Sequence, residues 1–469
     1  MLNDNILLMT DSYKFTHYKQ YPEGTEKVYS YLESRGGEFK ETVFFGLQYF
    51  IKKYLVGQVV TKEKIDQAEK FVDAHIGPGV FNRVDWEYIL EKYDGRLPLK
   101  IRAIPEGTVI KGKNALVVME NTDERCFWLT NYLETIMLNN TWYGITVATL
   151  SKNFKDLINV YLEETGDPSL LPFKLHDFGY RGVSSNESAA IGGAAHLINF
   201  MGTDTVAGAL MAMDFYQSDM PGFSIPASEH STITSWGKKN ELAAFENMLD
   251  QYPTGLVACV SDSFNIYKAC EEYWGTQLKD KILGRDGTLV VRPDSGNPIE
   301  VVIDVLNLLG EKFGYEVNSK GYKVLPPQIR VIQGDGIDLS MCEEILEAMK
   351  LEKWSADNVA FGCGGALLQK LNRDTLKFAF KCSNITINGE DRPVFKDPVT
   401  DPGKVSKKGK FKVVLDKGFL DDDLNNERHV TVRLDDPRED CLIDVFENGT
   451  LLVDQSFSSI RERSNKRYK

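Results

Sequence analysis

A cluster of polar and aromatic residues at positions 176–181 has the side chains of an enzyme site. A short apolar segment precedes the cluster, as it would at the end of a β-strand. Ser184 and Glu187 follow at the spacing of a capping box, which predicts a helix through about Phe200. In α/β enzymes, such a junction of strand and helix is where a site is presented. The cluster consists of His176, Asp177, Phe178, Tyr180 and Arg181.

Similar corners recur along the middle of the chain, where short apolar segments alternate with predicted helices. This alternation is typical of parallel βα units, whose strand ends converge on one mouth when they form a barrel. Each corner alone could be a helix N-cap, which is a common role of Asp or Ser. Seven polar corners in succession instead favour a shared site. The corners lie at Asp177, Asp204, Glu229–His230, Asp262, Asp294, Asp335 and Gly362–Gly365.

The two ends of the chain have a different pattern, which predicts a second domain. We expect a (β/α) barrel-like domain over 171–372 and a mixed α+β domain formed by 1–170 together with 373–469. In the second domain we expect a strand at 27–32, helices over 61–95 and a hairpin that turns at 105–107. We also expect separate helices at 126–138 and 145–164, and a frayed basic tail at 461–469.

Composition excludes several classes of protein. The formal charge of −13 argues against a broad nucleic-acid or anionic-membrane surface, so a phosphate ligand must meet locally concentrated cations. No apolar run has the length of a membrane span, and the N-terminus lacks a secretory pattern. Seven scattered cysteines without a CxxC pair indicate reduced thiols and a cytoplasmic protein. The six histidines show no HxxxH spacing, which argues against a tightly held zinc ion.

The corners together have the groups that bind a nucleotide-like ligand. Glycine-rich corners such as 334–336 and 362–365 expose backbone N–H groups, which favour a phosphate at a helix start. Phe178, with Arg181 nearby, could hold a flat ring by stacking. The acidic corners could hold hydrated Mg²⁺ or sugar hydroxyls. Arg292 supplies a cation within the mouth, and more phosphate could be bound by Arg373, Lys381 and Lys396.

Segments spread along nearly the whole chain resemble the nicotinate/nicotinamide phosphoribosyltransferase family, and most strongly its nicotinamide-specific members. The resemblance implies an irregular (β/α) barrel of the type II phosphoribosyltransferase kind. It also implies the transfer of phosphoribose from phosphoribosyl pyrophosphate to nicotinamide in NAD salvage. The matching segments are Thr10–Lys14, Lys27–Tyr31, Lys92–Gly95, Lys174–Ser185, Gly202–Gly208, Glu229–Thr234, Val260–Ser263, Arg292–Pro298, Val331–Gly336, Lys381–Ser383 and Val394–Pro398.

The resemblance assigns the nicotinamide ring to a sandwich between Phe178 and Tyr13 of a second subunit. From its spacing alone, Tyr13 would be interpreted as a packed aromatic residue. Arg181 and Asp204 would meet the carboxamide end of the base. A carboxylate such as Asp204 accepts a hydrogen bond from the amide of nicotinamide but repels the carboxylate of nicotinate. The resemblance therefore implies a homodimer with shared active sites.

The remaining implied roles concern phosphate and ATP. His230 is similar to the histidine that this family phosphorylates with ATP as an optional co-substrate, and Asp262 to the carboxylate that orients it. Asp294 would act with these two residues and contact ribose. Mg²⁺ would accompany the pyrophosphate. Ribose and phosphate contacts would come from Arg35 of a second subunit and from Arg292, Gly334, Asp335, Gly364, Gly365, Arg373, Lys381 and Lys396.

The sequence departs from the family pattern in the phosphate loop, where Cys363 and Ala366 interrupt a run that is commonly richer in Ser and Gly. Residues 417–428 also match poorly. Three alternatives remain. A nicotinate phosphoribosyltransferase is disfavoured by Asp204, and a non-catalytic signalling protein by the complete set of charged corners. A sugar-phosphate lyase would need a Schiff-base lysine, and Lys381 fits phosphate better.

Overall fold

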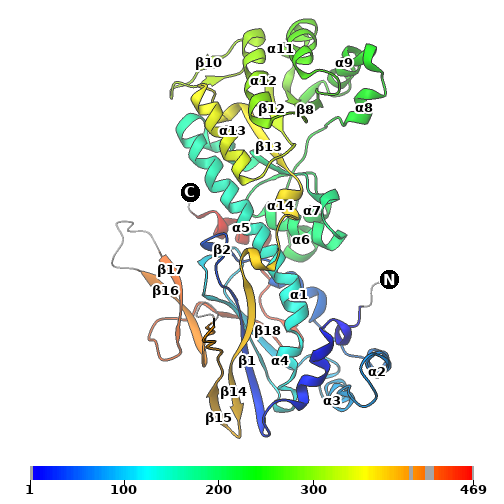
Figure 1. Ribbon diagram of the computed structural model, residues 1–469, viewed down its shortest axis with the longest axis vertical. Coiled ribbons are helices and arrows are strands. Elements are labelled where there is room, and N and C mark those ends of the chain that lie inside the picture. The colour runs from blue at the N-terminus through cyan, green and yellow to red at the C-terminus, as the bar shows by residue number, and fades with distance from the viewer. Residues whose placement is uncertain (1–3, 401–404, 418–426, 467–469) are drawn as a thin grey trace. The chain divides into compact units, whose positions relative to one another are not determined.

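The computed structural model describes residues 4–400, 405–417 and 427–466, and the chain forms two compact units (Figure 1). Unit 1 comprises Met1–Thr149, Asp214–Ser218 and Asn372–Lys469, and unit 2 comprises Leu150–Met213 and Asp219–Leu371. The C-terminal segment thus joins the N-terminal one in a single unit. The domain boundaries expected from sequence, at 170/171 and 372/373, remain a proposal.

Unit 1 is built on a seven-stranded antiparallel sheet with the order β15-β14-β1-β5-β3-β18-β19. Its central strands are almost wholly buried, because aromatic and β-branched residues fill both faces. The strands are β1 Thr25–Ser34, β3 Leu99–Ala103, β5 Ala115–Asn121, β14 Phe378–Ile387, β15 Glu390–Pro393, β18 Ile443–Glu447 and β19 Thr450–Leu451. Two smaller sheets pair β2 Glu41–Val43 with β4 Val109–Lys111, and β16 Phe411–Lys417 with β17 Glu427–Arg433.

Three expectations for unit 1 were wrong in detail. The strands that flank 105–107 do not form a hairpin, because β4 pairs with β2 while β3 pairs with β5. The two expected helices at 126–138 and 145–164 are replaced by α4 Leu129–Tyr132 and one continuous helix, α5 Glu134–Thr165. Gly144 does not end that helix because it is buried, and packing outweighs its low helix propensity. The expected frayed tail begins within a helix, α15 Phe457–Ser464.

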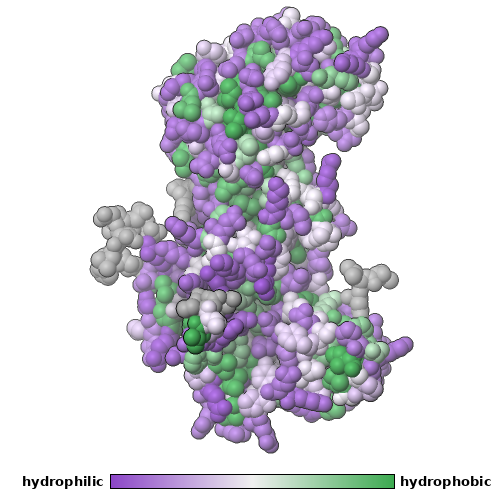
Figure 2. All heavy atoms as spheres, in the orientation of Figure 1, coloured by the Kyte–Doolittle hydropathy of each residue, from purple (hydrophilic) through white to green (hydrophobic). Residues whose placement is uncertain are grey.

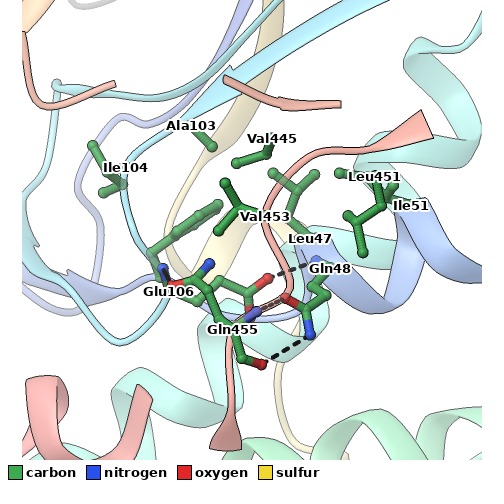
Figure 3. Close-up of a pocket in the computed structure, with 11 residues that line it drawn as sticks. Leu47, Gln48, Ile51, Ala103, Ile104, Glu106, Val445, Leu451, Val453 and Gln455 are labelled. Carbon is green, nitrogen blue, oxygen red and sulfur yellow. Dashed lines mark hydrogen bonds between the residues drawn. The ribbon is translucent and has the colours of Figure 1, made fainter. Parts of the chain in front are cut away.

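A buried carboxylate anchors the first helix of unit 1. Glu106, which is 1% exposed, accepts hydrogen bonds from the N–H groups of Gly46 (2.9 Å) and Gln48 (2.6 Å) at the start of α1 Leu47–Tyr54. The Tyr216 hydroxyl adds a third at 3.1 Å. Figure 3 shows Glu106 and Gln48 beside Gln455, whose N–H donates to Gln48 Oε1 at 2.7 Å. This network satisfies the free amides of the helix start. The other helices are α2 Lys62–His75 and α3 Arg83–Tyr93.

Unit 2 contains a six-stranded parallel sheet with the order β7-β6-β13-β12-β9-β8 (Figure 1). Its four longer strands contain runs of apolar residues that are mostly buried, as parallel strands covered on both faces require. The strands are β6 Leu175–Asp177, β7 Gly202–Thr203, β8 Thr254–Val260, β9 Asp286–Arg292, β12 Ile329–Gln333 and β13 Val359–Cys363. Six of the seven expected strand ends are therefore confirmed.

The seventh expected strand, which leads to Glu229, is not a regular strand. Its segment instead forms one parallel bridge to each edge of the sheet, at Gly202↔Phe223 and Ala227↔Ala258. Proline at position 226 cannot donate to a ladder, although its carbonyl oxygen accepts from the Ala258 N–H at 2.9 Å. The segment thus links β7 to β8, and the ring of strands closes as an irregular barrel.

Helices surround this barrel, and α12 and α13 pack against each other beside β12 (Figure 1). The expected helix after the aromatic cluster is α6 Asn186–Leu197, but its N-cap is Ser185 rather than Ser184, because Ser185 Oγ accepts from the Ser188 N–H at 3.0 Å. The other helices are α7 Val206–Tyr216, α8 His230–Thr234, α9 Glu241–Gln251, α10 Ile266–Lys268, a π-helix Ala269–Gln277, α11 Lys279–Leu283, α12 Pro298–Phe313, α13 Leu339–Leu351 and α14 Gly365–Leu368. A small hairpin pairs β10 Glu316–Val317 with β11 Lys323–Val324.

A buried lysine anchors the start of β6. Lys174 Nζ donates to the carbonyl oxygens of Ala356 (2.7 Å), Asp357 (3.0 Å) and Val359 (2.9 Å). Burial lowers the pKa of Lys174 to about 7, and Asp357 opposes part of this shift. The bonds tie β6 to the start of β13 and so help to fix where the next residues, including Phe178, leave the barrel.

The face shown in Figure 2 is mostly hydrophilic, with small hydrophobic areas between the polar ones. Among the described residues, none of the helices has both the length and the apolar character that crossing a membrane would require.

Candidate active site

Six of the expected corners lie at the same edge of the parallel sheet of unit 2. Because all six strands run in one direction, their carboxyl ends meet at one mouth. Asp177 ends β6 and Asp204 follows β7, and these two strands are neighbours. The other strand ends lead to Asp262, Asp294, Asp335 and Gly364.

The ring of Phe178 lies on glycines at this mouth. A Cβ atom on Gly362 would overlap the ring atoms Cε2 and Cδ2, and one on Gly334 would lie 3.2 Å from Cε2. The Phe178 N–H donates to the carbonyl oxygen of Cys363 at 3.0 Å, which fixes the backbone beside β13. The Arg292 guanidinium lies 5.8 Å from the ring centroid. The glycines therefore provide the space that Phe178 occupies, while the side chain stays half-buried.

An apolar layer supports the ring from within the barrel. Ala258, Val290 and Ile332 form a buried cluster, and Phe178 and Ile225 pack against it. These residues come from β8, β9, β12, the turn after β6 and the segment that closes the barrel. The aromatic residue is thus held by the core, which favours one ring orientation.

Two acidic residues lie next to Phe178. Asp177 is fully buried, and its Oδ1 accepts from the Gly179 N–H at 2.7 Å. No donor reaches its Oδ2 with hydrogen-bond geometry in the described part of the chain, although the Thr205 hydroxyl is near enough to favour the charged form weakly. Burial therefore raises the pKa of Asp177 to about 6. Asp204 is exposed, its N–H donates to the Asp177 carbonyl at 2.9 Å, and its Oδ1 accepts from the Ser224 hydroxyl.

His230 lies between two carboxylates. Its Nε2 is 2.9 Å from Asp262 Oδ1, and its Nδ1 is 4.0 Å from Asp294 Oδ2. The Asp262 side chain is only 5% exposed, whereas that of His230 is 48% exposed. Because a carboxylate only accepts, the bond to Asp262 assigns a proton to Nε2, and in the neutral imidazole Nδ1 then presents its lone pair. This arrangement leaves one ring nitrogen available as a nucleophile.

Arg292 and Asp294 form a bidentate pair on the turn after β9. Arg292 Nε donates to Asp294 Oδ1 at 3.1 Å, and Nη2 donates to Oδ2 at 2.7 Å. The pair brings a cation beside Phe178 and a carboxylate beside His230. The structure thus links the ring-holding and acidic parts of the mouth through one short turn.

The other expected residues of unit 2 are more open. Arg181 and Asp335 are exposed, and Gly364 and Gly365 are half-buried. Gly182 lies close to the glycine-rich turn after β13, because a Cβ on it would lie 3.5 Å from the Gly365 Cα. The exposure of these residues leaves room for a ligand. Their contacts with a bound ligand remain a prediction.

The other expected residues belong to unit 1, where Lys381 interacts with three other cations. Lys381 lies on β14, and its pKa is lowered by burial and by Arg35, Lys14 and Lys396, with Glu134 opposing. Arg35 Nε bonds Glu33 Oε1 at 3.3 Å. These four cations outnumber the two acids bonded to them, Glu134 on Lys14 and Glu33 on Arg35, so the group suits an anion.

Two further expected residues of unit 1 lie at its surface. Tyr13 is 58% exposed, although the segment around it is held in place: Lys14 Nζ bonds Glu134 Oε2 at 2.6 Å, and Asp11 Oδ2 accepts from Thr135 at 2.7 Å. Arg373 is also exposed and bonds Asp374 Oδ1 at 3.0 Å. Tyr13 is therefore not the packed aromatic residue that spacing alone suggested.

Several partners of these residues were not found from the sequence. Ser295 holds Asp262, Ser224 holds Asp204, and Lys14 anchors the segment that carries Tyr13. Each lies next to or within a segment that carries an expected residue, but only the fold brings donor and acceptor together.

The pocket of Figure 3 lies in unit 1, and its lining contains none of the expected site residues.

The donor set of the mouth fits a metal ion that is shared with a substrate. In the described ranges, no three His, Cys, Asp or Glu residues come close enough together to hold a metal ion by themselves. Mg²⁺ commonly uses one or two carboxylates together with phosphate oxygens and water. Asp294 and Asp335 are the carboxylates that could join in such binding.

Comparisons with known proteins agree with this geometry. The family model "Nicotinate phosphoribosyltransferase (NAPRTase) family" matches residues 173–449, and "Nicotinamide phosphoribosyltransferase, N-terminal domain" matches residues 5–101. A curated relative named nicotinamide phosphoribosyltransferase, from Xanthomonas campestris, is 48% identical over 98% of both chains. Another of that name, from Acinetobacter baylyi, is 34% identical over 98% of this chain and 97% of its own.

Two solved structures have a similar fold. Nicotinate-nucleotide pyrophosphorylase from Pyrococcus furiosus aligns with a TM-score of 0.65 at 17% identity, covering 100% of this chain and 96% of its own. Human nicotinic acid phosphoribosyltransferase aligns with a TM-score of 0.56 at 15% identity, covering 98% and 93%. The fold is therefore that of a type II phosphoribosyltransferase. The chain belongs to the nicotinate phosphoribosyltransferase (NAPRTase) family, and it is a pentosyltransferase.

The close contact between Gly362 and the ring of Phe178 can be tested by measuring the stability of a variant. Gly362→Ala places a methyl group within the aromatic ring, so we expect the free energy of unfolding to fall by about 1–3 kcal/mol. Gly365→Ala is the matched control, because nothing lies within 4 Å of its Cβ position. Chemical denaturation of the three proteins measures both effects. Equal stability of Gly362→Ala and wild type would contradict the close contact between Gly362 and the Phe178 ring.

Proposed function

We propose that this enzyme joins nicotinamide to phosphoribosyl pyrophosphate, forming nicotinamide mononucleotide and pyrophosphate in NAD salvage. The observation that carries this choice of base is the position of Asp204, whose backbone bonds that of Asp177, the residue before Phe178. A ring stacked on Phe178 would present its substituent to this exposed carboxylate. The names of the relatives at 48% and 34% identity support the same base.

Asp204 also provides a reason to reject nicotinate. An ionised carboxylate accepts a hydrogen bond from an amide NH₂ group, whereas it repels a second carboxylate. Ser224 already donates to Oδ1, which leaves Oδ2 for the substrate. A nicotinate phosphoribosyltransferase is the alternative, since the family is described by that substrate. A non-catalytic signalling role finds no specific support in the site.

The proposed reaction needs little proton transfer. The pyridine nitrogen attacks C1 of the ribose while the bond from C1 to the pyrophosphate oxygen breaks, and the electron pair leaves with pyrophosphate. Positive charge develops on the sugar and negative charge on the leaving group, so cations at the mouth stabilise the transition state. Arg292, which is paired with Asp294, would contribute to this stabilisation, and the turns that carry Gly334, Asp335, Gly364 and Gly365 would hold ribose and phosphate. Bound Mg²⁺ would supply further neutralisation of the pyrophosphate.

ATP would act through His230. In the proposed step, the Nδ1 lone pair attacks the γ-phosphorus, the bond to the ADP oxygen breaks, and ADP leaves. The proton stays on Nε2, where Asp262 accepts it in a hydrogen bond. Later hydrolysis of the phosphohistidine drives product formation. Asp294 lies on the Nδ1 side and would orient the ribose or phosphate there.

We further propose a cytoplasmic homodimer in which each site is completed by a second copy. Tyr13 would form the other face of the ring sandwich, and Arg35, Arg373, Lys381 and Lys396 would bind phosphates. The exposure of Tyr13, whose segment is anchored by Lys14, supports its role in the sandwich. All seven cysteines are free, which supports the cytoplasmic location.

Sedimentation should show a dimer. An active monomer would contradict the shared site, and recovery of the activity outside the cytoplasm would contradict the location.

The ATP step is tested by comparing His230→Ala with wild type. Purified protein, Mg²⁺, nicotinamide and phosphoribosyl pyrophosphate are incubated with and without ATP, and nicotinamide mononucleotide is measured by chromatography. Wild type should synthesise it faster with ATP, while His230→Ala should lose the stimulation by ATP more than basal synthesis. His429→Ala is the control, because this histidine lies on β17 of unit 1, outside the segments that carry the expected site residues. Full stimulation in His230→Ala would show that the histidine assignment is wrong.

A further inference from the structure

The hydroxyl of Ser295 reaches from the turn after β9 to the carboxylate that follows β8. Its Oγ donates to Asp262 Oδ2 at 2.5 Å, while Asp262 Oδ1 bonds His230 at 2.9 Å. The two turns start side by side, because Val260 and Arg292 are register partners. Both oxygens of a largely buried carboxylate are therefore in use, one for the histidine and one for the serine.

His230 depends on this carboxylate for its direction. The histidine begins a helix of only five residues, and its side chain is half exposed. Within the described residues, its other charged neighbour is Asp294, whose 4.0 Å separation is too long for a hydrogen bond. The plane of the Asp262 carboxylate thus sets where the imidazole points.

A single donor would leave that plane loosely defined. The terminal torsion of an aspartate is broad, so a carboxylate with one partner can rotate about its Cβ–Cγ bond. A second donor on the other oxygen removes this freedom. Ser295 is suited to the task because its turn is braced on both sides: Arg292 bonds Asp294 twice, and Asn297 caps α12 by accepting from the N–H groups of Ile299 and Glu300.

We propose that Ser295 is a positioning residue for His230, an inference that rests on the ATP step proposed above. By holding Asp262, Ser295 keeps the proton on Nε2 and keeps the Nδ1 lone pair directed into the mouth. The N–P bond then forms at Nδ1 as the P–O bond to ADP breaks, and no proton has to leave the ring. Without Ser295, the imidazole samples other orientations, and fewer ATP encounters lead to transfer.

The test uses two variants and a matched control. Ser295→Ala removes the donor, and Ser295→Thr keeps a hydroxyl on the same backbone. Ser340→Ala removes a similar bond on the surface of α13, where the hydroxyl donates to Glu344 Oε1 at 3.0 Å. The rate of phosphohistidine formation is measured in single turnovers with ATP labelled at the γ-phosphate, together with KM for ATP. The tautomer of His230 is read from ¹⁵N NMR spectra of histidine-labelled protein.

We expect Ser295→Ala to slow phosphohistidine formation about 10-fold, the effect typical of losing a hydrogen bond to a charged group. KM for ATP should change less than this rate, because the serine does not contact ATP in the proposed step. The NMR spectrum should change from the Nε2–H tautomer to a mixture. Ser295→Thr should recover most of the rate, and Ser340→Ala should match wild type.

Two results would overturn the inference alone: a wild-type rate and tautomer in Ser295→Ala, or an equal loss in Ser295→Thr, which would indicate packing rather than the hydroxyl. A wild-type enzyme that synthesises nicotinamide mononucleotide but forms no phosphohistidine would overturn the ATP step, and the inference with it. The two failures are thus distinguished by the behaviour of the wild-type protein.

Discussion

The contact on which the site depends is the one between the ring of Phe178 and the glycines at the mouth of the barrel. Gly362 has no Cβ, and the ring occupies the volume that a side chain would need. Below the ring, Ala258, Val290 and Ile332 complete the support. A flat aromatic face held by the core is pre-organised for stacking, so less conformational entropy is lost when a ring binds. In the proposed function, the neighbouring turns would meet the substituent, the sugar and the phosphates of a ligand.

Charge is distributed to match such a ligand, although the chain as a whole is acidic at −13. Within unit 2, acids predominate at the mouth, and Arg292 is balanced by Asp294. Within unit 1, Lys381 shares a cationic neighbourhood with Arg35 and Lys396. A concentrated group of cations can attract an anion locally without making the whole surface attractive to nucleic acid. The buried Asp177, whose pKa is raised to about 6, adds negative charge near Asp204 at neutral pH.

The sequence predicted the barrel and most of its corners. A buried parallel strand requires an apolar run, and its carboxyl end at the mouth can carry polar residues. The failures are equally physical. Ser184 and Ser185 are adjacent and both are good caps, so spacing could not choose between them. The segment before Glu229 looked like a strand, but proline at position 226 limits it to single bridges. The separate helices expected at 126–138 and 145–164 are instead largely joined in one long helix, because most of the residues between them, Gly144 included, are buried and held by packing.

The roles of individual site residues were only partly predictable. Asp262 and His230 stood out as polar corners, but the partner of Asp262 was missed because Ser295 is 33 residues away and meets it only across neighbouring strands. Expected loop residues in 417–428 lie largely outside the described residues. Roles that depend on a bound ligand or a second copy, such as that of Tyr13, were suggested by resemblance and remain proposals.

The central claim is that a ring on Phe178 presents its substituent to the carboxylate of Asp204. The most direct measurement is a product assay in which phosphoribosyl pyrophosphate and Mg²⁺ are supplied with equal concentrations of nicotinamide and nicotinate, and both mononucleotides are quantified. The account predicts nicotinamide mononucleotide almost exclusively, and a lower ratio of the two products for Asp204→Asn, which lacks the repelling charge. Nicotinate mononucleotide as the main product of the wild-type enzyme would contradict it.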